Sequence, residues 1–329
     1  MNSRHHHSLF WPTLLIGVGL IWLLVNLGVI APASLNSIWQ FWPLLLVWLG
    51  LDIIFRHQRA WIGDLIGILA VGGLVAYLVL QPSTGVVQTT AQTRLENFSS
   101  PLSDTASVTY NFETASEPVN IYALASNSDK LIDANLVHQG DIDFSVTGNQ
   151  NKLVVLSERT YPSSWFNWSL NSLQSKWDIG LAGSVDSDIT IDGGSGTINA
   201  DFTGVKVQRL SLDLGSGASS FTLPQTEENL SADLNSGSGS VNLTLPVMTN
   251  ITLRIESGSG ALNINVPENA ALQVVVLDSG SGSLNLPSNL TRISGNDETG
   301  TWQTADFANA DYQITIKVMD QGSGSISIN

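Results

Sequence analysis

The sequence predicts two architectures in one chain: an α-helical transmembrane region of three helices, followed by an all-β domain built as a repeat β-solenoid. Three apolar stretches lie close together before residue 81, and a Gly-Ser-Gly triplet recurs at near-constant intervals after residue 193. Between them lie short alternating runs typical of strands. An antiparallel β-sandwich is the alternative for the β-domain. We expect a transmembrane region over 1–80, a flexible linker over 81–100, a β-rich part over 101–180 and the repeat domain over 181–329.

The three apolar stretches run over about 9–30, 38–55 and 61–80. Each is close to the ~20 residues that a helix needs to cross ~30 Å of hydrocarbon. The first stretch is long, has no small-residue cleavage site and is followed almost at once by the second. It is therefore predicted to be a retained span and not a signal peptide.

The arginines predict how these spans are oriented. Arg56 and Arg59 lie in the only basic loop, whereas the loop over 31–37 has no charge. Basic loops stay on the cytoplasmic side, and Arg4 agrees with this placement. The N-terminus is therefore expected inside, and the chain after residue 80 outside.

Polar and small residues within the spans are candidates for helix contacts, because such residues hold membrane helices together. The candidates are Asn26, Asp52, Gly63, Asp64 and Gly67. The simpler interpretation for the two carboxylates is pairing at the membrane boundary, since Asp52 lies four residues before Arg56 and Asp64 lies near Arg59. The other interpretation is docking of a partner's helix.

The segment over 81–100 is polar, with no apolar period, and reads as a flexible tether. Short alternating strands follow from about 107 to 157. An aromatic cluster then precedes the first triplet; it comprises Trp165, Phe166, Trp168 and Trp177. We expect this cluster to cap the exposed end of the stack, with membrane contact or sugar stacking as alternatives.

The strongest signal is the Gly-Ser-Gly triplet, whose glycines permit a turn. It starts at Gly194, Gly215, Gly237, Gly258, Gly280 and Gly322. The last interval is about twice the others, so one triplet is missing there. A fixed period of this size marks a repeat architecture.

The residues around each triplet fall into one register, with apolar and polar positions alternating as in strands. Apolar residues stand three positions before it: Ile191, Leu212, Leu234, Ile255, Leu277 and Met319. Apolar residues also stand six positions after it: Ala200, Phe221, Leu243, Ile264, Leu286 and Ile328. Each repeat should supply two strands and two turns, and stacking of six or seven such coils should bury the apolar face.

Acidic or amide residues stand two positions before the triplets. They are Asp192, Asp213, Asn235, Glu256, Asp278 and Asp320. We expect them to accept the turn glycine's N–H, as in Asx-turns. The five carboxylates among them are the weak candidates for a Ca²⁺ site. The calcium-binding nonapeptide repeat has a different period, and we predict no metal and no other cofactor.

The composition excludes several function classes. The net charge is −15, from 13 basic and 28 acidic residues, so no nucleic-acid partner is expected. With no cysteine, disulfides and thiolate zinc sites are excluded. No Walker loop, His-Glu-x-x-His motif or nucleophile elbow with a plausible histidine is present, and His138 is the only histidine after the spans. The sequence therefore predicts no enzyme.

The first two spans share one motif: Phe10-Trp11-Pro12-Thr13-Leu14-Leu15 matches Phe41-Trp42-Pro43-Leu44-Leu45-Leu46, and Gly19-Leu20 matches Gly50-Leu51. This doubled hairpin resembles the transmembrane region of LiaF/LiaI-like bacterial cell-envelope stress proteins. The stretch from Trp177 onward, with Ile189-Thr190-Ile191-Asp192-Gly193-Gly194-Ser195-Gly196 and its later copies, resembles the toast-rack and adhesin-type repeat domains.

The resemblance implies a plasma-membrane protein of the response to cell-wall-active antibiotics, a family without catalytic residues. It implies membrane lipid and a sensor histidine kinase as partners, because better-known relatives restrain such a kinase. The chain departs from many relatives by its third span and by Gly-Ser-Gly in place of Gly-Ala-Gly. The alternative function is a membrane-anchored surface binding or adhesion module, with a cell-wall or surface ligand.

Overall fold

The computed structural model describes residues 15, 18–20, 22–24, 73, 94–138, 140–159, 175–296 and 298–329. The chain divides into two compact units, one of Met1–Thr90 with Pro162–Asn171 and one of Ala91–Tyr161 with Ser172–Asn329. The described residues before 94 are helical. Among the described residues, no helix has the length and apolar character needed to cross a membrane. Most of the three predicted spans lies outside the described residues.

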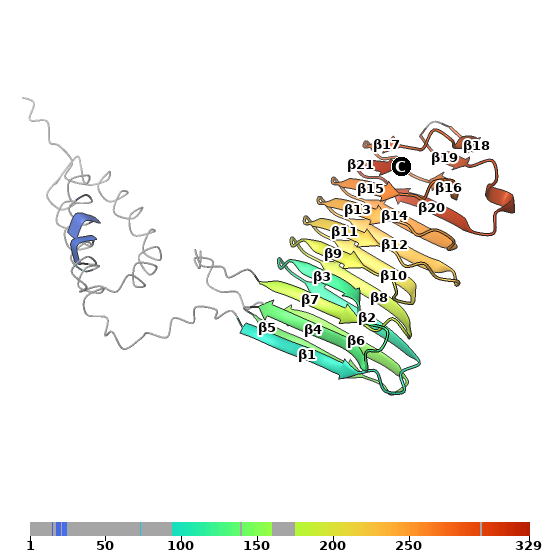
Figure 1. Ribbon diagram of the computed structural model, residues 1–329. Coiled ribbons are helices and arrows are strands. Elements are labelled where there is room, and N and C mark those ends of the chain that lie inside the picture. Colours follow the sequence, from blue (N-terminus) through green and yellow to red (C-terminus); the bar gives the residue numbers. More distant parts are fainter. Residues whose placement is uncertain are drawn as a thin grey trace, which may run out of the picture. The chain divides into compact units, whose positions relative to one another are not determined.

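The second unit is built from two large mixed sheets (Figure 1). Sheet A contains, in spatial order, β1 (Arg94–Pro101), β4 (Lys130–His138), β7 (Lys176–Leu181), β3 (Val119–Ala123), β9 (Ile198–Asp201), β11 (Ala218–Thr222), β13 (Ser240–Thr244), β15 (Ala261–Asn265), β21 (Ser325–Ile328) and β17 (Ser283–Asn285). Sheet B contains β18 (Thr291–Gly295), β19 (Gly300–Gln303), β16 (Ala271–Val276), β20 (Gln313–Asp320), β14 (Ile251–Ser257), β12 (Leu230–Ser236), β10 (Val207–Leu214), β8 (Asp186–Gly193), β2 (Ser107–Thr114), β6 (Asn151–Arg159) and β5 (Asp141–Thr147). A short 3-10 helix, η2 (Phe307–Asn309), precedes β20.

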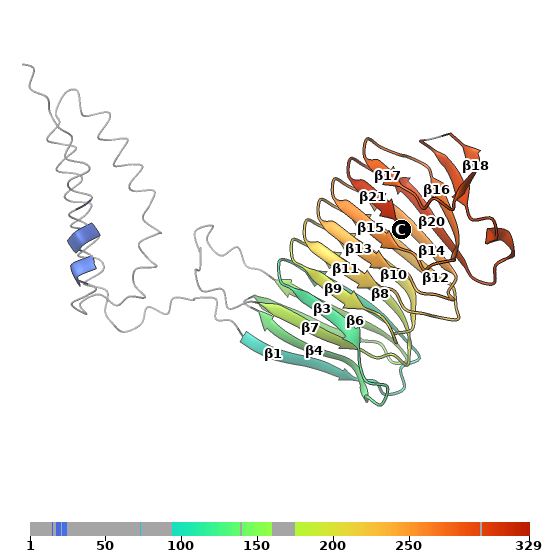
Figure 2. The ribbon, with the colours of Figure 1, turned by 45° about the horizontal axis from the view of Figure 1, so that its top comes forward.

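Each repeat forms one coil, with a strand in sheet B, a turn at the triplet and a strand in sheet A. Neighbouring coils pair in parallel and in register, so that Leu212 of β10 lies opposite Ile191 of β8 and Leu234 of β12. This is the stacking of a β-solenoid (Figure 2). The antiparallel alternative is wrong for the repeats. Antiparallel pairs join β1, β4 and β7, β5 and β6, and β16, β19 and β18.

The coils do not follow sequence order at either end of the stack. Their spatial order is β6/β7, β2/β3, β8/β9, β10/β11, β12/β13, β14/β15, β20/β21 and β16/β17. The coil β2/β3 therefore lies between two later coils, and β20/β21 is inserted between β14/β15 and β16/β17. The long last interval between triplets is not a pair of successive coils, as the sequence suggested. The chain forms the β18–β19 hairpin and η2 there before it returns to the stack.

The predicted core register holds in the first four repeats and fails in the last two only before the triplet, since after it Ile328 is buried and Leu286 packs against the core. Leu277 and Met319, three positions before their triplets, are 55% and 36% exposed. A β-bulge explains the exposure of Met319: Ile255 of β14 pairs with Val318, and the next pair joins Glu256 to Asp320, which leaves Met319 as the extra residue. The buried residues at this level are Val318 and Val276, which pair with each other.

The segment predicted as a linker contains a strand. β1 pairs with β4 from Arg94 onward, although its side chains are mostly polar. Phe98 packs against Phe144 with ring centroids 5.3 Å apart, and Asn97 donates to Asp133 and Asn135. The linker prediction is therefore wrong from residue 94, and residues 81–93 lie outside the described residues. The two predicted parts of the β-domain fold as one compact unit.

Trp177 is a core residue and not part of an end cap. It is fully buried in β7, between Val119 of β3 and Leu136 of β4. Tyr110 is also fully buried, and its hydroxyl donates to the Leu131 carbonyl at 2.9 Å. Burial raises the pKa of that phenol. The other members of the aromatic cluster, Trp165, Phe166 and Trp168, lie outside the described residues.

Candidate functional site

The glycines of the triplets are required by the close approach of neighbouring coils. A Cβ on Gly239 would lie 2.0 Å from the Gly217 carbonyl oxygen, and one on Gly260 would lie 1.9 Å from the Gly239 oxygen. No side chain fits at such distances. Among the six triplet-starting glycines, only Gly280 and Gly322 have a positive φ, of 54° and 64°. Sequence reasoning thus found the right residues, but in four repeats the cause is packing between coils.

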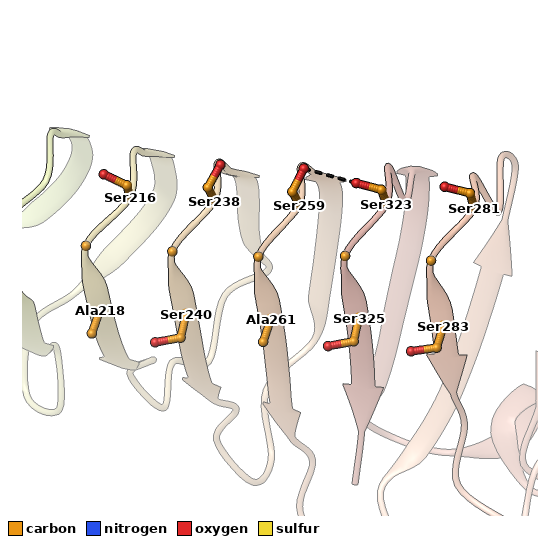
Figure 3. A pocket seen from close by; sticks show the side chains of 15 residues that line it. Ser216, Ala218, Ser238, Ser240, Ser259, Ala261, Ser281, Ser283, Ser323 and Ser325 are labelled. Atoms are coloured by element: carbon orange, nitrogen blue, oxygen red, sulfur yellow. Dashed lines mark hydrogen bonds between the residues drawn. The ribbon is translucent and has the colours of Figure 1, made fainter.

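The middle serines of the triplets form a ladder along one rim of the stack (Figure 3). The backbone N–H of Ser238 donates to the Gly215 carbonyl of the preceding coil at 3.2 Å, and Ser259 donates to Gly237 at 3.1 Å. The backbone is therefore satisfied without the hydroxyls. The hydroxyls of Ser259 and Ser323 contact each other at 3.0 Å, as the dashed line in Figure 3 marks. Within the described part of the chain, those of Ser216 and Ser238 make no protein hydrogen bond.

These serines line an open groove of about 840 Å³ that crosses five neighbouring coils. Figure 3 shows two rows of side chains in it, one from the triplets and one from the starts of the sheet A strands. The lining residues are Ser216, Gly217, Ala218, Ser238, Gly239, Ser240, Ser259, Gly260, Ala261, Ser281, Gly282, Ser283, Ser323, Gly324 and Ser325. Because coils in a parallel sheet repeat every ~4.8 Å, the groove offers hydroxyls at a regular spacing. We call it the serine groove.

The groove continues into an uncharged outer face of sheet A. The outward positions of β11, β13, β15, β21 and β17 are Ala218, Ser220, Thr222, Ser240, Asn242, Thr244, Ala261, Asn263, Asn265, Ser325, Ser327, Ser283 and Asn285. Asn263 donates to Asn242 at 3.1 Å across two coils. In a chain of net charge −15, this face can contact a ligand through hydrogen bonds without charge repulsion.

The outer face of sheet B has the opposite character, because charged side chains pair across its strands. Arg209 contacts Asp188 at 2.7 Å, and this pair raises the pKa of the guanidinium. Arg254 lies 3.4 Å from Asp233 in the next two strands. Over the strands that adjoin the serine groove, the face of sheet A therefore differs in charge from that of sheet B, and this uncharged part is the better candidate for a ligand.

The predicted acidic turn positions lie near the C-terminal ends of the sheet B strands, next to the turns. Asp192, Asp213, Asn235, Glu256 and Asp320 lie opposite one another in successive strands. The Asx-turn occurs in the last two repeats, where Gly280 donates to Asp278 at 3.0 Å and Gly322 donates to Asp320 at 2.8 Å.

In the other repeats the turn glycine donates to a carbonyl of the neighbouring coil, as Gly215 does to Gly193 at 2.7 Å. The Asx interpretation is therefore wrong at these positions. Among the described residues no group of three or more side chains could hold a metal ion.

The other residues that the sequence singled out lie elsewhere. The helix-contact candidates Asn26, Asp52, Gly63, Asp64 and Gly67 lie outside the described residues. His138 is buried, with its Nδ1 2.8 Å from the Gly140 carbonyl oxygen and its Nε2 3.7 Å from Glu96. Sequence reasoning missed the serine groove, although the constant position of serine within each triplet was a visible signal of it.

Comparison with known proteins yields two family matches. Residues 10–88 match the LiaF transmembrane domain, and residues 90–244 match the N-terminal domain of the toast-rack family. No curated protein matches the chain significantly.

Two solved structures are similar in part. One is a proposed cell adhesion protein from Clostridium sporogenes, 17% identical, with a TM-score of 0.46, covering 71% of this chain and 99% of that one. The other is a proposed adhesin from Bacteroides fragilis, 12% identical, with a TM-score of 0.27, covering 72% of this chain and 97% of that one. The two family matches confirm the resemblance inferred from the doubled Phe-Trp-Pro hairpin and from the repeats. The chain is therefore similar to LiaF-like proteins over residues 10–88 and to the toast-rack family over residues 90–244.

Proposed function

We propose that this chain is a non-enzymatic regulator of the cell-envelope stress response that acts through a membrane partner such as a sensor histidine kinase. The observation that carries the proposal is the match of residues 10–88 to the LiaF transmembrane domain, in the same chain as a folded β-domain. In this proposal the N-terminus is cytoplasmic and the β-domain faces the outer side of the plasma membrane. The arginines at positions 4, 56 and 59 support that orientation.

The β-domain has the properties expected of a sensor domain that binds a component of the cell envelope. Its backbone is fixed by ladders on both sheets, and the outer face of sheet A over β11, β13, β15, β21 and β17 is uncharged and lined with hydrogen-bonding side chains. β1 begins only a few residues after the matched membrane domain and is held along its length by β4. The end of the β-domain that follows the membrane domain is therefore a strand held firmly in the sheet. Binding of a ligand to the β-domain would act on the membrane domain through this strand.

The test changes the proposed helix contacts. Asp52→Ala and Asn26→Leu, singly and together, should alter the output of the partner kinase with and without a cell-wall-active antibiotic, because each removes a polar group from a span. A transcriptional reporter of the envelope response measures this. Leu51→Ile and Val25→Leu are matched controls, since they keep the neighbouring positions apolar. Unchanged output in the double variant, at normal protein level, would remove the helix contact from the proposal.

The second candidate is a surface binding or adhesion module that uses its membrane part only as an anchor. The serine groove favours it, because a regular array of serine hydroxyls suits contact with a polymer. Replacing the segment 1–80 with an unrelated three-span anchor separates the two functions. Retained envelope function would support the module, whereas its loss would support the regulator.

A further inference from the structure

A second, smaller pocket of about 440 Å³ lies at the C-terminal end of the serine groove. It is lined by Ser279, Gly280, Ser281, Gly282, Leu284, Leu286, Glu298, Trp302 and Gln321. Ser281 and Gly282 line both the groove and this end pocket, so the two form one continuous surface. A volume of this size lies within the range of ordinary small-ligand pockets, ~300–1,000 Å³.

The end pocket contains a buried donor without a partner. Gln321 directly follows β20, its side chain is 1% exposed, and its amide nitrogen makes no hydrogen bond within the described part of the chain. Such groups are rare, because an unsatisfied buried donor destabilises the folded state. A Cβ on Gly282 would lie 3.0 Å from this nitrogen, so the glycine keeps open the space beside it. The amide is therefore a buried donor for which the described residues supply no acceptor.

The remaining groups of the end pocket define the class of that ligand. Trp302 is partly buried and packs against the core, which fixes an indole at the wall of the pocket. Glu298 is exposed and supplies a carboxylate acceptor, while Leu284 and Leu286 supply apolar surface. A fixed aromatic ring, a carboxylate and an amide donor together fit a sugar, which has an apolar C–H face and hydroxyl donors around its ring.

The unpaired amide of Gln321 indicates which group on the sugar it contacts. A hydroxyl could accept from Gln321, but it would bring a donor proton that needs an acceptor of its own. A carbonyl oxygen accepts and brings no proton, so an acyl group on the sugar satisfies the amide without creating a new unpaired group. A negatively charged sugar is disfavoured, because the chain carries a net charge of −15 and the end pocket contains Glu298.

We propose that the end pocket binds one N-acylated residue of a neutral glycan strand, and that the strand continues along the serine groove. Gln321 donates to the acyl carbonyl, Trp302 stacks on the ring and Glu298 accepts from a hydroxyl. The triplet serines contact the following residues of the strand. The inference supplies the ligand class for the proposed envelope function, but its chemistry comes from the pocket alone.

The experiment measures glycan binding by the full-length protein in lipid nanodiscs, by titration calorimetry. The probe is chitotetraose, and cellotetraose, which has the same linkage and lacks the acyl groups, is the ligand control. Chitotetraose should bind at least tenfold more tightly than cellotetraose. Equal binding of the two, or no binding of chitotetraose at millimolar concentration, would overturn the proposal. So would tighter binding of an uncharged tetrapeptide than of chitotetraose.

Two variants test the named residues. Gln321→Met keeps the shape of the side chain and removes its donor, and it should weaken chitotetraose binding by about tenfold. Ser281→Tyr blocks the junction of groove and pocket and should have a similar effect. The matched controls are Gln208→Met and Ser211→Tyr on β10, which should bind as the parent does. Thermal unfolding checks that all four variants are folded, and parental affinity in a folded Gln321→Met protein would refute the assignment.

The same variants separate this inference from the proposed regulation. If Gln321→Met loses binding but leaves the antibiotic response of the reporter unchanged, the pocket stands and its link to regulation fails. If Asn26→Leu with Asp52→Ala leaves both binding and output unchanged, the pocket also stands and the regulatory helix contact fails.

Discussion

At the scale of single residues, glycine has two different uses in this domain. In most triplets it permits two coils to approach until backbone meets backbone, as at Gly239. Only at the last two triplets does it supply a left-handed conformation. Sequence alone does not distinguish these uses, because both require the same missing side chain.

The first prediction concerns this close approach. Gly239→Ala should lower the free energy of unfolding by about 3 kcal/mol, at the upper end of the usual cost of overpacking, because the clash is with a backbone oxygen. Chemical denaturation measures the change. Ser238→Ala, its neighbour, has an exposed hydroxyl without a protein partner and should change stability by less than about 0.5 kcal/mol. Equal stability of the two variants would contradict the packing argument.

The second prediction concerns the attachment of β1. A hydrogen bond from Lys130, at 2.8 Å, lowers the pKa of Asp133 below its ordinary value of 3.8, and a weaker contribution comes from Asn97. A carboxyl with a lowered folded-state pKa stabilises the fold above its unfolded value, and that stability is lost as the pH falls through the lowered pKa.

Asp133→Asn should therefore lose stability at pH 7 and show a shallower loss on acidification below pH 3.8 than the parent. Urea unfolding at a series of pH values measures this. Asp104→Asn, at an exposed turn, is the control and should follow the parental curve. An acid dependence of Asp133→Asn as steep as the parent's would show that the pairing with Lys130 contributes nothing.

At the scale of elements, the repeats of the middle of the stack could be predicted, and the ends could not. Period and alternation identify the coils from β8/β9 to β14/β15, because every coil there makes the same contacts. β1 has a polar sequence and becomes a strand only through pairing with β4 and the contact of Phe98 with Phe144. The insertion of β20/β21 depends on which edge the returning chain meets, and periodicity contains no information on that.

The third prediction tests this insertion. Ile316→Asp places a charge at a fully buried position of β20 and should detach the coil, at a cost of several kcal/mol. Because β20 pairs with both β14 and β16, hydrogen exchange should accelerate in both strands. Lys317→Asp, the next residue on the outer face, should leave protection there unchanged. Faster exchange in β16 alone would indicate stacking in sequence order.

At the scale of the whole molecule, charged side chains are unevenly distributed over the surface, and the net charge does not show where they lie. The net charge of −15 predicted an acidic domain, and sheet B agrees with it through pairs such as Arg209 with Asp188. The uncharged face of sheet A and the end pocket could not be predicted from that total. Gln321 in particular looks like an ordinary polar residue in the sequence, and only its burial without a partner marks it.

The fourth prediction tests the proposed topology and uses the absence of cysteine from the chain. Single substitutions Ser34→Cys, Gln58→Cys and Asn127→Cys each create one reactive site. A membrane-impermeant maleimide applied to intact cells should label the first and third, which are proposed to lie outside. Gln58→Cys should react only after the membrane is permeabilised, and its labelling in intact cells would reverse the orientation.

The position of β20/β21 inside the stack has a consequence for how the protein is made. A chain that emerges from its N-terminal end delivers β14 and β16 before β20, so for a time these two strands are free to pair directly and in the wrong order. The strand β20 must insert between β14 and β16 before they pair with each other, or displace one from the other afterwards. A chain that ends before β20 would lack the strand that pairs with both β14 and β16, and its incomplete stack would be a target for quality-control proteases. The stack is thus complete only after β20 has been synthesised.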